Sequence, residues 1–200
     1  MNIHPPNFYS QSHNLKQYKS NDRNMIQDFE NLIRQDLHRY LMAQGELEER
    51  LPDAPDIEER WEVIAQSYMT DGVREFGDYP VVSLGWMMYV GMAIAHMWDT
   101  DWQRYSALPD LYLSLRDVRG YDAMDEHIRE DILDLHGDAF TALERLVGEC
   151  AARTYNQLRH SGYESGTKDA FQAYVACLHQ LYLMGAAVQL LRMGYHMVKA

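Results

Sequence analysis

One histidine and three aspartates recur at helical spacing between residues 127 and 138. His127, Asp131, Asp134 and Asp138 follow one another at intervals of four, three and four residues. In a helix this spacing places all four side chains on one face. Because imidazole and carboxylate groups bind zinc, iron or manganese, His127, Asp131 and Asp134 form a candidate metal site. A row of acids beside an apolar seam is also typical of a solvated helix face, and we prefer that interpretation because a pattern on one helix is a weak signal.

A second cluster combines a histidine with acidic and aromatic residues. His96 ends a long apolar stretch, and the residues that follow it include Asp99, Asp101 and Trp102. A neutral imidazole in apolar surroundings can act as a base or as a ligand. The alternative is a core histidine whose nitrogens bond to a carbonyl or a carboxylate group, and this alternative is the preferred one.

Two arginines stand close together at a predicted helix junction. Arg116 and Arg119 precede Gly120 and Tyr121. Paired guanidinium groups can clamp a carboxylate or a phosphate group. They can equally bridge to Asp99 and Asp101 and hold the corner together, which we consider the better interpretation. If the two clusters meet, they form the most polar concave point of the protein, and the candidate ligand-binding residues are then His96, Asp99, Asp101, Trp102, Arg116, Arg119 and Tyr121.

Several enzyme signatures are missing from the sequence. It has no glycine-rich phosphate loop, no Gly-x-Ser-x-Gly motif, no Cys-x-x-Cys pair and no His-Glu-x-x-His motif. Paired Glu-x-x-His motifs of di-metal bundles are also missing. A nucleotide kinase, a common hydrolase or a zinc peptidase is therefore disfavoured. The sequence indicates no particular cofactor and leaves open whether the protein is an enzyme.

Two nearly uncharged segments are the main structural signal. Residues 79–98 contain no formal charge, and 168–197 contain a second long uncharged stretch. A helix that is apolar on all sides is expected in the centre of a bundle. A membrane span is the alternative for 79–98. We do not favour it, because the segment contains Pro80, Gly85, Gly91 and His96 and has acidic flanks without a positive cluster.

Amphipathic patterns predict further helices around this pair. One helix is expected to begin near 20–24 and to end at Gly45. Another is capped by Ser106, buries Val118 and ends at Gly120, and helical residues continue over 121–160 with a break expected at His136–Asp138. The chain is therefore predicted to be all-α, with an N-terminal arm at 1–20 that is flexible or docked. Residues 21–200 are then a single-domain bundle of about five to seven helices around the central helix pair 79–98 and 168–197.

Charge and cysteine content narrow the classes of partner. The net charge of −12 opposes binding to nucleic acid and to an anionic membrane surface, so neither partner is expected. Cys150 and Cys177 are expected to be reduced core thiols in a cytoplasmic protein, a single bridge between them being the alternative. We therefore expect a helical protein-interaction or scaffold domain that self-associates as a homo-oligomer. The alternative function is a small-ligand- or metal-binding bundle, with or without enzymatic activity, that uses the His/Asp-rich residues including His136.

Overall fold

The protein is all-helical. The computed structural model describes residues 8–78 and 80–196, with side chains over 24–74 and 80–196. No strand occurs in these residues, which confirms the predicted all-α bundle. Six helices have nine residues or more: α1 (Phe8–Ala43), α3 (Trp61–Asp78), α4 (Pro80–Thr100), α6 (Leu111–Arg119), α8 (Gly137–His160) and α9 (Lys168–Arg192). Shorter elements connect them: α2 (Pro55–Glu58), α5 (Trp102–Ser106), the 3₁₀ turn η1 (Tyr121–Ala123), α7 (Met124–His127) and the π-helical turn η2 (Ile128–Ile132).

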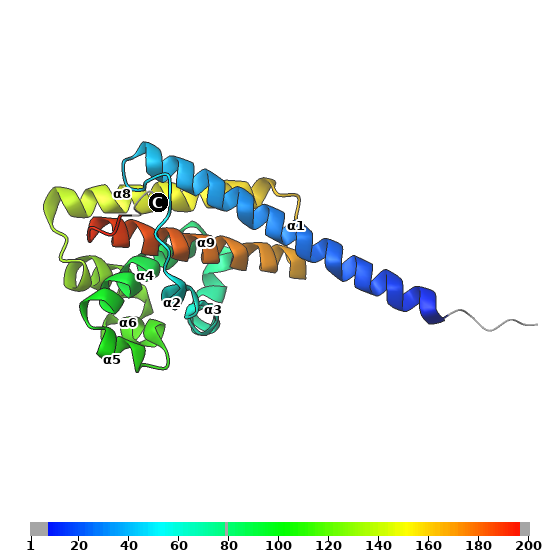
Figure 1. The fold of residues 1–200 in the computed structure, drawn as a ribbon, viewed down its shortest axis with the longest axis horizontal. Coiled ribbons are helices and arrows are strands. Elements are labelled where there is room, and N and C mark those ends of the chain that lie inside the picture. Colours follow the sequence, from blue (N-terminus) through cyan, green and yellow to red (C-terminus); the bar gives the residue numbers. More distant parts are fainter. Residues whose placement is uncertain (1–7, 79, 197–200) are drawn as a thin grey trace, which may run out of the picture.

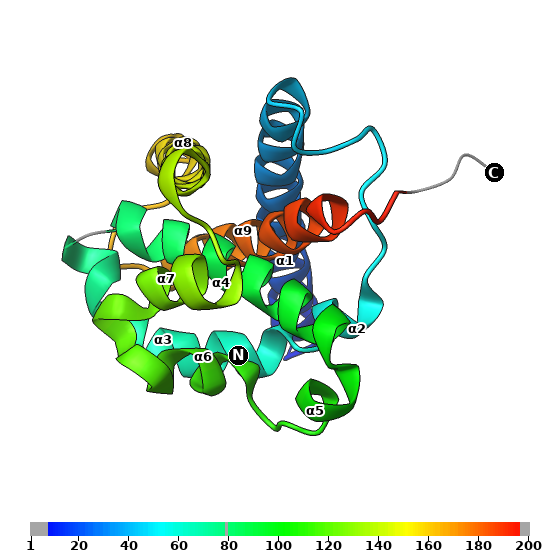
Figure 2. The ribbon, with the colours of Figure 1, turned by 90° about the vertical axis from the view of Figure 1, so that its left-hand side faces the viewer.

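The two predicted central helices are the centre of the structure. Helices α4 and α9 pack most extensively against each other, and both are buried along most of their lengths. Figure 2 shows this pair in the middle, with α8 on one side and α3 and α6 on the opposite side. Because the pair is covered on several sides, it has no broad solvated face that charged residues would occupy, which explains its composition.

The two helices cross where each contributes a glycine, Gly91 of α4 and Gly185 of α9. A Cβ atom at Gly91 would lie 2.1 Å from the carbonyl oxygen of Tyr182, and one at Gly185 would lie 2.1 Å from that of Met88. These distances are far below van der Waals contact, so the crossing requires hydrogen at both positions. Gly185 makes the middle of α9 slim, and Gly91 is its counterpart on α4.

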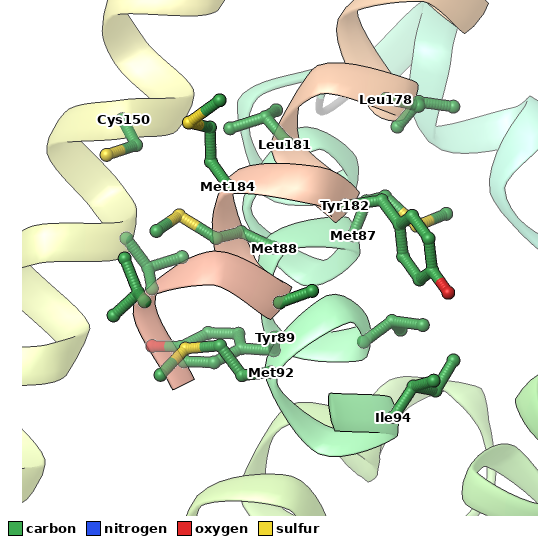
Figure 3. Packing of buried hydrophobic residues seen from close by; sticks show 14 of the residues in the cluster. Met87, Met88, Tyr89, Met92, Ile94, Cys150, Leu178, Leu181, Tyr182 and Met184 are labelled. Carbon is green, nitrogen blue, oxygen red and sulfur yellow. The ribbon is translucent and has the colours of Figure 1, made fainter. Parts of the chain in front are cut away.

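Methionine, tyrosine and cysteine fill the space around the crossing. Figure 3 shows the methionines of α4 and α9 with Cys150 of α8 to one side. Cys150 and Cys177 are free and buried, as the prediction of reduced core thiols requires. Burial raises the pKa of the Cys150 thiol to about 12, so the thiol remains protonated at neutral pH.

By length and composition alone, α4 and α9 would each suffice to cross a bilayer. In the structure most of each apolar stretch is buried inside the protein. Core helices of soluble proteins share this composition, so hydropathy is weak evidence for a membrane span here.

Helix α1 packs on α9 and α8 through residues of its second half. Its apolar contacts with the core are spaced about one turn apart: Phe29, Ile33, Leu37 and Leu41. At 1.5 Å per residue its 36 residues measure about 54 Å. In Figure 1 the N-terminal part of α1 extends well beyond the other helices.

A polar cluster lies within the interface between α1 and α9. Glu30 of α1 accepts hydrogen bonds from His179 Nδ1 at 2.7 Å and from Gln180 Nε2 at 2.8 Å. Burial acts to raise the pKa of the Glu30 carboxyl, but the hydrogen bonds from His179 and Gln180 outweigh burial and hold it below its ordinary value. Trp61 stacks on the His179 ring with 4.7 Å between centroids. Glu30 therefore remains ionised at neutral pH and helps to fix the register of α1 on α9.

Two predicted boundaries of the outer and central helices were wrong. α1 begins at Phe8 rather than near 20–24, so the helix extends into the predicted arm 1–20; residues 1–7 lie outside the described residues, and docking of the arm stays a prediction. α9 ends at Arg192 rather than at 197, because Gly194 adopts a φ of 94°. The Tyr195 N–H then bonds to the Leu190 carbonyl and the Gly194 N–H to the Leu191 carbonyl, which satisfies the last turn.

The region between 100 and 137 also differs in detail from the prediction. Asp110, not Ser106, caps α6, and Val118 is 59% exposed instead of buried. The predicted break in 121–160 is confirmed, since α8 begins at Gly137 after an extended His136. Before this break the chain forms the π-helical turn η2 and then Asp134, which has a φ of 50°.

Candidate functional site

A cleft of about 460 Å³ opens where the C-terminal end of α4 meets α5, α6 and the turn α7–η2. Four residues that the sequence singled out line it together: His96 and Asp101, and His127 and Asp131. They come from two clusters about thirty residues apart in the chain. The remaining lining is mostly apolar and includes Met97, Tyr105, Leu108, Leu115, Val118 and Ile132. A cleft that combines apolar walls with convergent polar groups is suited to a small molecule.

Helix caps hold the walls of this cleft in place. Asp101 caps α5 by accepting the Arg104 N–H at 3.2 Å. Asp110 caps α6 by accepting the Tyr112 N–H at 2.9 Å, and its other oxygen accepts a hydrogen bond from Ser67 of α3. Gly120 ends α6 with a φ of 83°, and the chain then turns into η1 and α7. These contacts bring α7 alongside α4 and place His127 beside the cleft.

His127 and Asp131 form a hydrogen-bonded pair one turn apart. His127 Nδ1 lies 2.7 Å from Asp131 Oδ2, and Arg119 Nη2 donates to Asp131 Oδ1 at 2.9 Å. The hydrogen bond from His127, together with the positive charge of Arg119, lowers the pKa of the Asp131 carboxyl. An ionised carboxylate only accepts hydrogen bonds, so Nδ1 carries the proton and Nε2 is the basic nitrogen of the ring. This is the arrangement of a histidine oriented by a carboxylate to act as a general base.

The aliphatic hydroxyl groups at the cleft are already engaged. Thr100 Oγ1 donates to the His96 carbonyl at 2.7 Å, and Ser114 Oγ donates to the Leu111 carbonyl at 2.7 Å. Neither hydroxyl is hydrogen-bonded to an imidazole ring. A base at His127 would therefore act on a proton of the ligand or on water, and not on a serine or threonine nucleophile.

Arg104 supplies a cation at the cleft. Its guanidinium carbon lies 5.1 Å above the Tyr105 ring, and among the described side chains it forms no ion pair. Other arginines nearby are neutralised by carboxylates, as Arg119 is by Glu130 at 2.8 Å. Arg104 is therefore the cleft's available partner for an anionic group.

The predicted metal ligands do not assemble. His127 and Asp131 bond to each other, while Asp134 lies beyond the π-helical turn and bonds to His136 at 3.1 Å on an exposed loop. No group of three histidine, cysteine or acidic side chains suited to a metal ion occurs in the part of the chain that the structure describes. The π-helical turn and the positive φ of Asp134 together break the helical face that the prediction assumed.

Arg116 and Arg119 do not bridge to Asp99 and Asp101. Arg116 instead binds Asp71 of α3 at 2.9 Å, where Asp71 also accepts the Tyr112 hydroxyl at 2.8 Å. Tyr121 packs edge-on against Trp86, with 4.7 Å between ring centroids. The predicted bridge to Asp99 and Asp101 is therefore wrong, and the two arginines pair with acids of α3 and η2. Arg116 fixes α6 on α3, and Arg119 fixes η2 on α6.

Asp99 and Trp102 lie apart from the cleft. Asp99 borders a separate hollow of about 260 Å³ between residues 52–57 and the end of α9, and it accepts a hydrogen bond from the Tyr195 hydroxyl. Trp102 is 56% exposed and lines neither cavity. The proposed single pocket therefore contains His96 and Asp101 but not Asp99, Trp102, Arg116, Arg119 or Tyr121.

Arg104 and Tyr105 were missed in the sequence. They belong to α5, a helix of five residues that no periodic pattern could reveal. Asp101, a residue type that often caps helices at their N-terminus, was the available sign that a helix begins there. The polar pair His179 and Gln180 in the otherwise apolar α9 was a sign of the Glu30 cluster.

Comparison of the chain with protein-family models, with curated proteins and with solved structures finds no match.

Proposed function

We propose that the protein binds a small molecule with an anionic group in the cleft between α4, α5, α6 and α7. Arg104 would hold the anion, and His127 would remove a proton from the ligand or from a water molecule beside it. The observation that carries the proposal is the hydrogen bond between His127 and Asp131 at a cleft of mixed polar and apolar lining that also contains Arg104. The mixed lining favours a ligand with a non-polar body attached to a carboxylate or phosphate group.

Proton abstraction is the chemistry that this arrangement supports. The charged partner Asp131 orients the ring and stabilises the imidazolium that forms when Nε2 takes up a proton. His96 lines the same cleft, with its Nδ1 3.5 Å from Gln189 Nε2. A second imidazole lining the same cleft as His127 can receive or return a proton during turnover.

Thermal unfolding in the presence of small carboxylates and inorganic phosphate tests the proposal. A ligand at one hundred times its dissociation constant stabilises the folded protein by about 2.7 kcal/mol. Arg104→Ala is expected to lose most of this stabilisation, whereas Arg159→Ala, an exposed arginine at the end of α8, should retain it. If no probe in the panel stabilises the wild type, or if Arg104→Ala responds as the wild type does, the proposed anion site is wrong.

Self-association is a second proposed function. The observation that favours it is the middle of α1, where Met25 and Leu32 are 52% and 48% exposed beside the buried residues Phe29 and Ile33. Apolar side chains on an outer helix are suited to contact with another protein surface. A protein partner and a cytoplasmic location likewise remain proposals.

A further inference from the structure

A groove lies beside the point where α1 leaves the body of the protein. It has a volume of about 540 Å³ and runs between α1 and the connection from α8 to α9. Its apolar floor includes Met25, Phe29 and Tyr163. Three carboxylates line it: Asp28, Glu164 and Asp169. Among the described side chains none of these three carboxylates forms an ion pair, so the groove is an acidic surface.

The projecting part of α1 has the opposite charge. Residues 8–24 contain Lys16, Lys19 and Arg23 against a single acid, Asp22, in a chain whose net charge is −12. The segment also contains Ser10, Ser12, Asn14, Ser20 and Asn21, which are poor helix formers. A helix of this composition that extends into water gains little stability from its own sequence. Contact with another protein surface would stabilise this helical segment.

The chain's own groove is not available to this segment. In Figure 1 residues 8–24 of α1 extend away from the body, whereas the groove is lined by Met25, Asp28 and Phe29 of the same helix and by the connection from α8 to α9. A second copy placed antiparallel about a two-fold axis near Asp22 brings its residues 15–19, which include Lys16 and Lys19, alongside residues 25–29 of the first, where α1 borders the groove. Both acidic grooves are then occupied by the same operation, as a closed two-fold dimer requires.

We propose that the acidic groove beside α1 receives the basic N-terminal half of α1 from a second copy of this chain. The proposal rests on the proposed self-association and specifies its geometry: an antiparallel pair of α1 helices. Apolar contact at Met25 and Leu32 contributes to the pairing, and the charges fix its direction.

Charge reversal with the full-length chain tests this arrangement by sedimentation equilibrium. One variant carries Lys16→Glu, Lys19→Glu and Arg23→Glu, and another carries Asp28→Lys and Glu164→Lys. Each alone is expected to raise the dimer dissociation constant at least about tenfold, since several opposed charges become like charges. An equimolar mixture of the two should form a heterodimer with affinity near that of the wild type. Arg145→Glu with Arg159→Glu, on exposed positions of α8, is the matched control and should leave the dimer intact.

The possible results distinguish self-association in general from the specific contact at the groove. A strictly monomeric wild type overturns both self-association and the groove assignment. A wild-type dimer that resists both charge reversals, or variants that do not recover on mixing, overturns the groove assignment and leaves self-association in place. Sedimentation of the monomeric wild type with anionic phospholipid vesicles would assign the basic segment to a membrane surface and would also overturn the proposal. Circular dichroism verifies that each variant keeps its helical content.

Discussion

Gly91→Ala is expected to lower the free energy of unfolding by about 3–5 kcal/mol. The added methyl group would lie 2.1 Å from the Tyr182 carbonyl oxygen, which belongs to the backbone of α9 and has no rotamer by which to move away. The two helices must therefore separate along their most buried contact. The gain in helix propensity from glycine to alanine, about 1 kcal/mol, offsets only a small part of this loss. Gly185→Ala should behave alike, because its methyl group would meet the Met88 carbonyl at 2.1 Å.

Gly85→Ala is the matched control on the same helix. It is also buried, but its Cβ atom would lie 3.5 Å from Val147 Cγ1 and 3.6 Å from Ala151 Cβ, which is ordinary contact. Chemical denaturation followed by circular dichroism should find this variant within about 1 kcal/mol of the wild type. Equal denaturation midpoints for Gly91→Ala and Gly85→Ala would show that α4 and α9 do not cross at the glycines.

Arg129→Met is expected to cost about 3 kcal/mol of stability. Arg129 is 5% exposed; its Nη2 donates to Asp125 Oδ2 at 2.7 Å, and its guanidinium lies 4.1 Å from the Phe140 ring centroid. Methionine preserves most of the side-chain volume but leaves the Asp125 carboxylate, which is 19% exposed, without its cation. The first helical turn of α8 would also lose its contact with η2, since Phe140 and Glu144 both meet Arg129.

Arg159→Met isolates the effect of burial from the effect of lost charge. Arg159 is exposed at the end of α8 and lies 5.8 Å from the Tyr155 ring centroid. Its replacement should change stability by no more than about 0.5 kcal/mol. Equal losses for the two substitutions would mean that the Asp125–Arg129 pair contributes no more than a surface contact.

The centre of the fold could be predicted because it depends on composition. α4 and α9 lack charged residues over most of their lengths, and only a position inside the bundle accommodates such helices without solvated polar groups. The close approach at Gly185 could also be predicted from the small residues around it. Its partner Gly91 required the structure, because the register of two helices depends on side chains from both.

The boundaries that the prediction missed depend on backbone geometry. A single glycine with positive φ ends α9 at Arg192, although the apolar pattern continues past that position. The π-helical turn η2 shifts the face of the helix after His127, and Asp134 leaves the face that its spacing assigned to it. Spacing rules for regular helices do not include such an insertion.

Only part of the candidate site could be predicted from the sequence. His127 and Asp131 are one helical turn apart, so their contact follows from spacing alone. Their meeting with His96 and Asp101 depends on how α7 packs against α4, which no local pattern encodes. Arg116 and Arg119 pair with acids of α3 and η2. Spacing rules describe contacts within one helix, so they could not predict these ion pairs.

The tautomer of His127 tests the proposed base most directly. Long-range proton–nitrogen correlation in the nitrogen-15-labelled protein, recorded where the imidazole is neutral, distinguishes a proton on Nδ1 from one on Nε2. We expect the proton on Nδ1 in the wild type, because Asp131 accepts it, and a shift toward protonated Nε2 in Asp131→Ala. A wild-type His127 with its proton on Nε2 would leave the ring without a basic nitrogen for a ligand, and the proposed function would then be wrong.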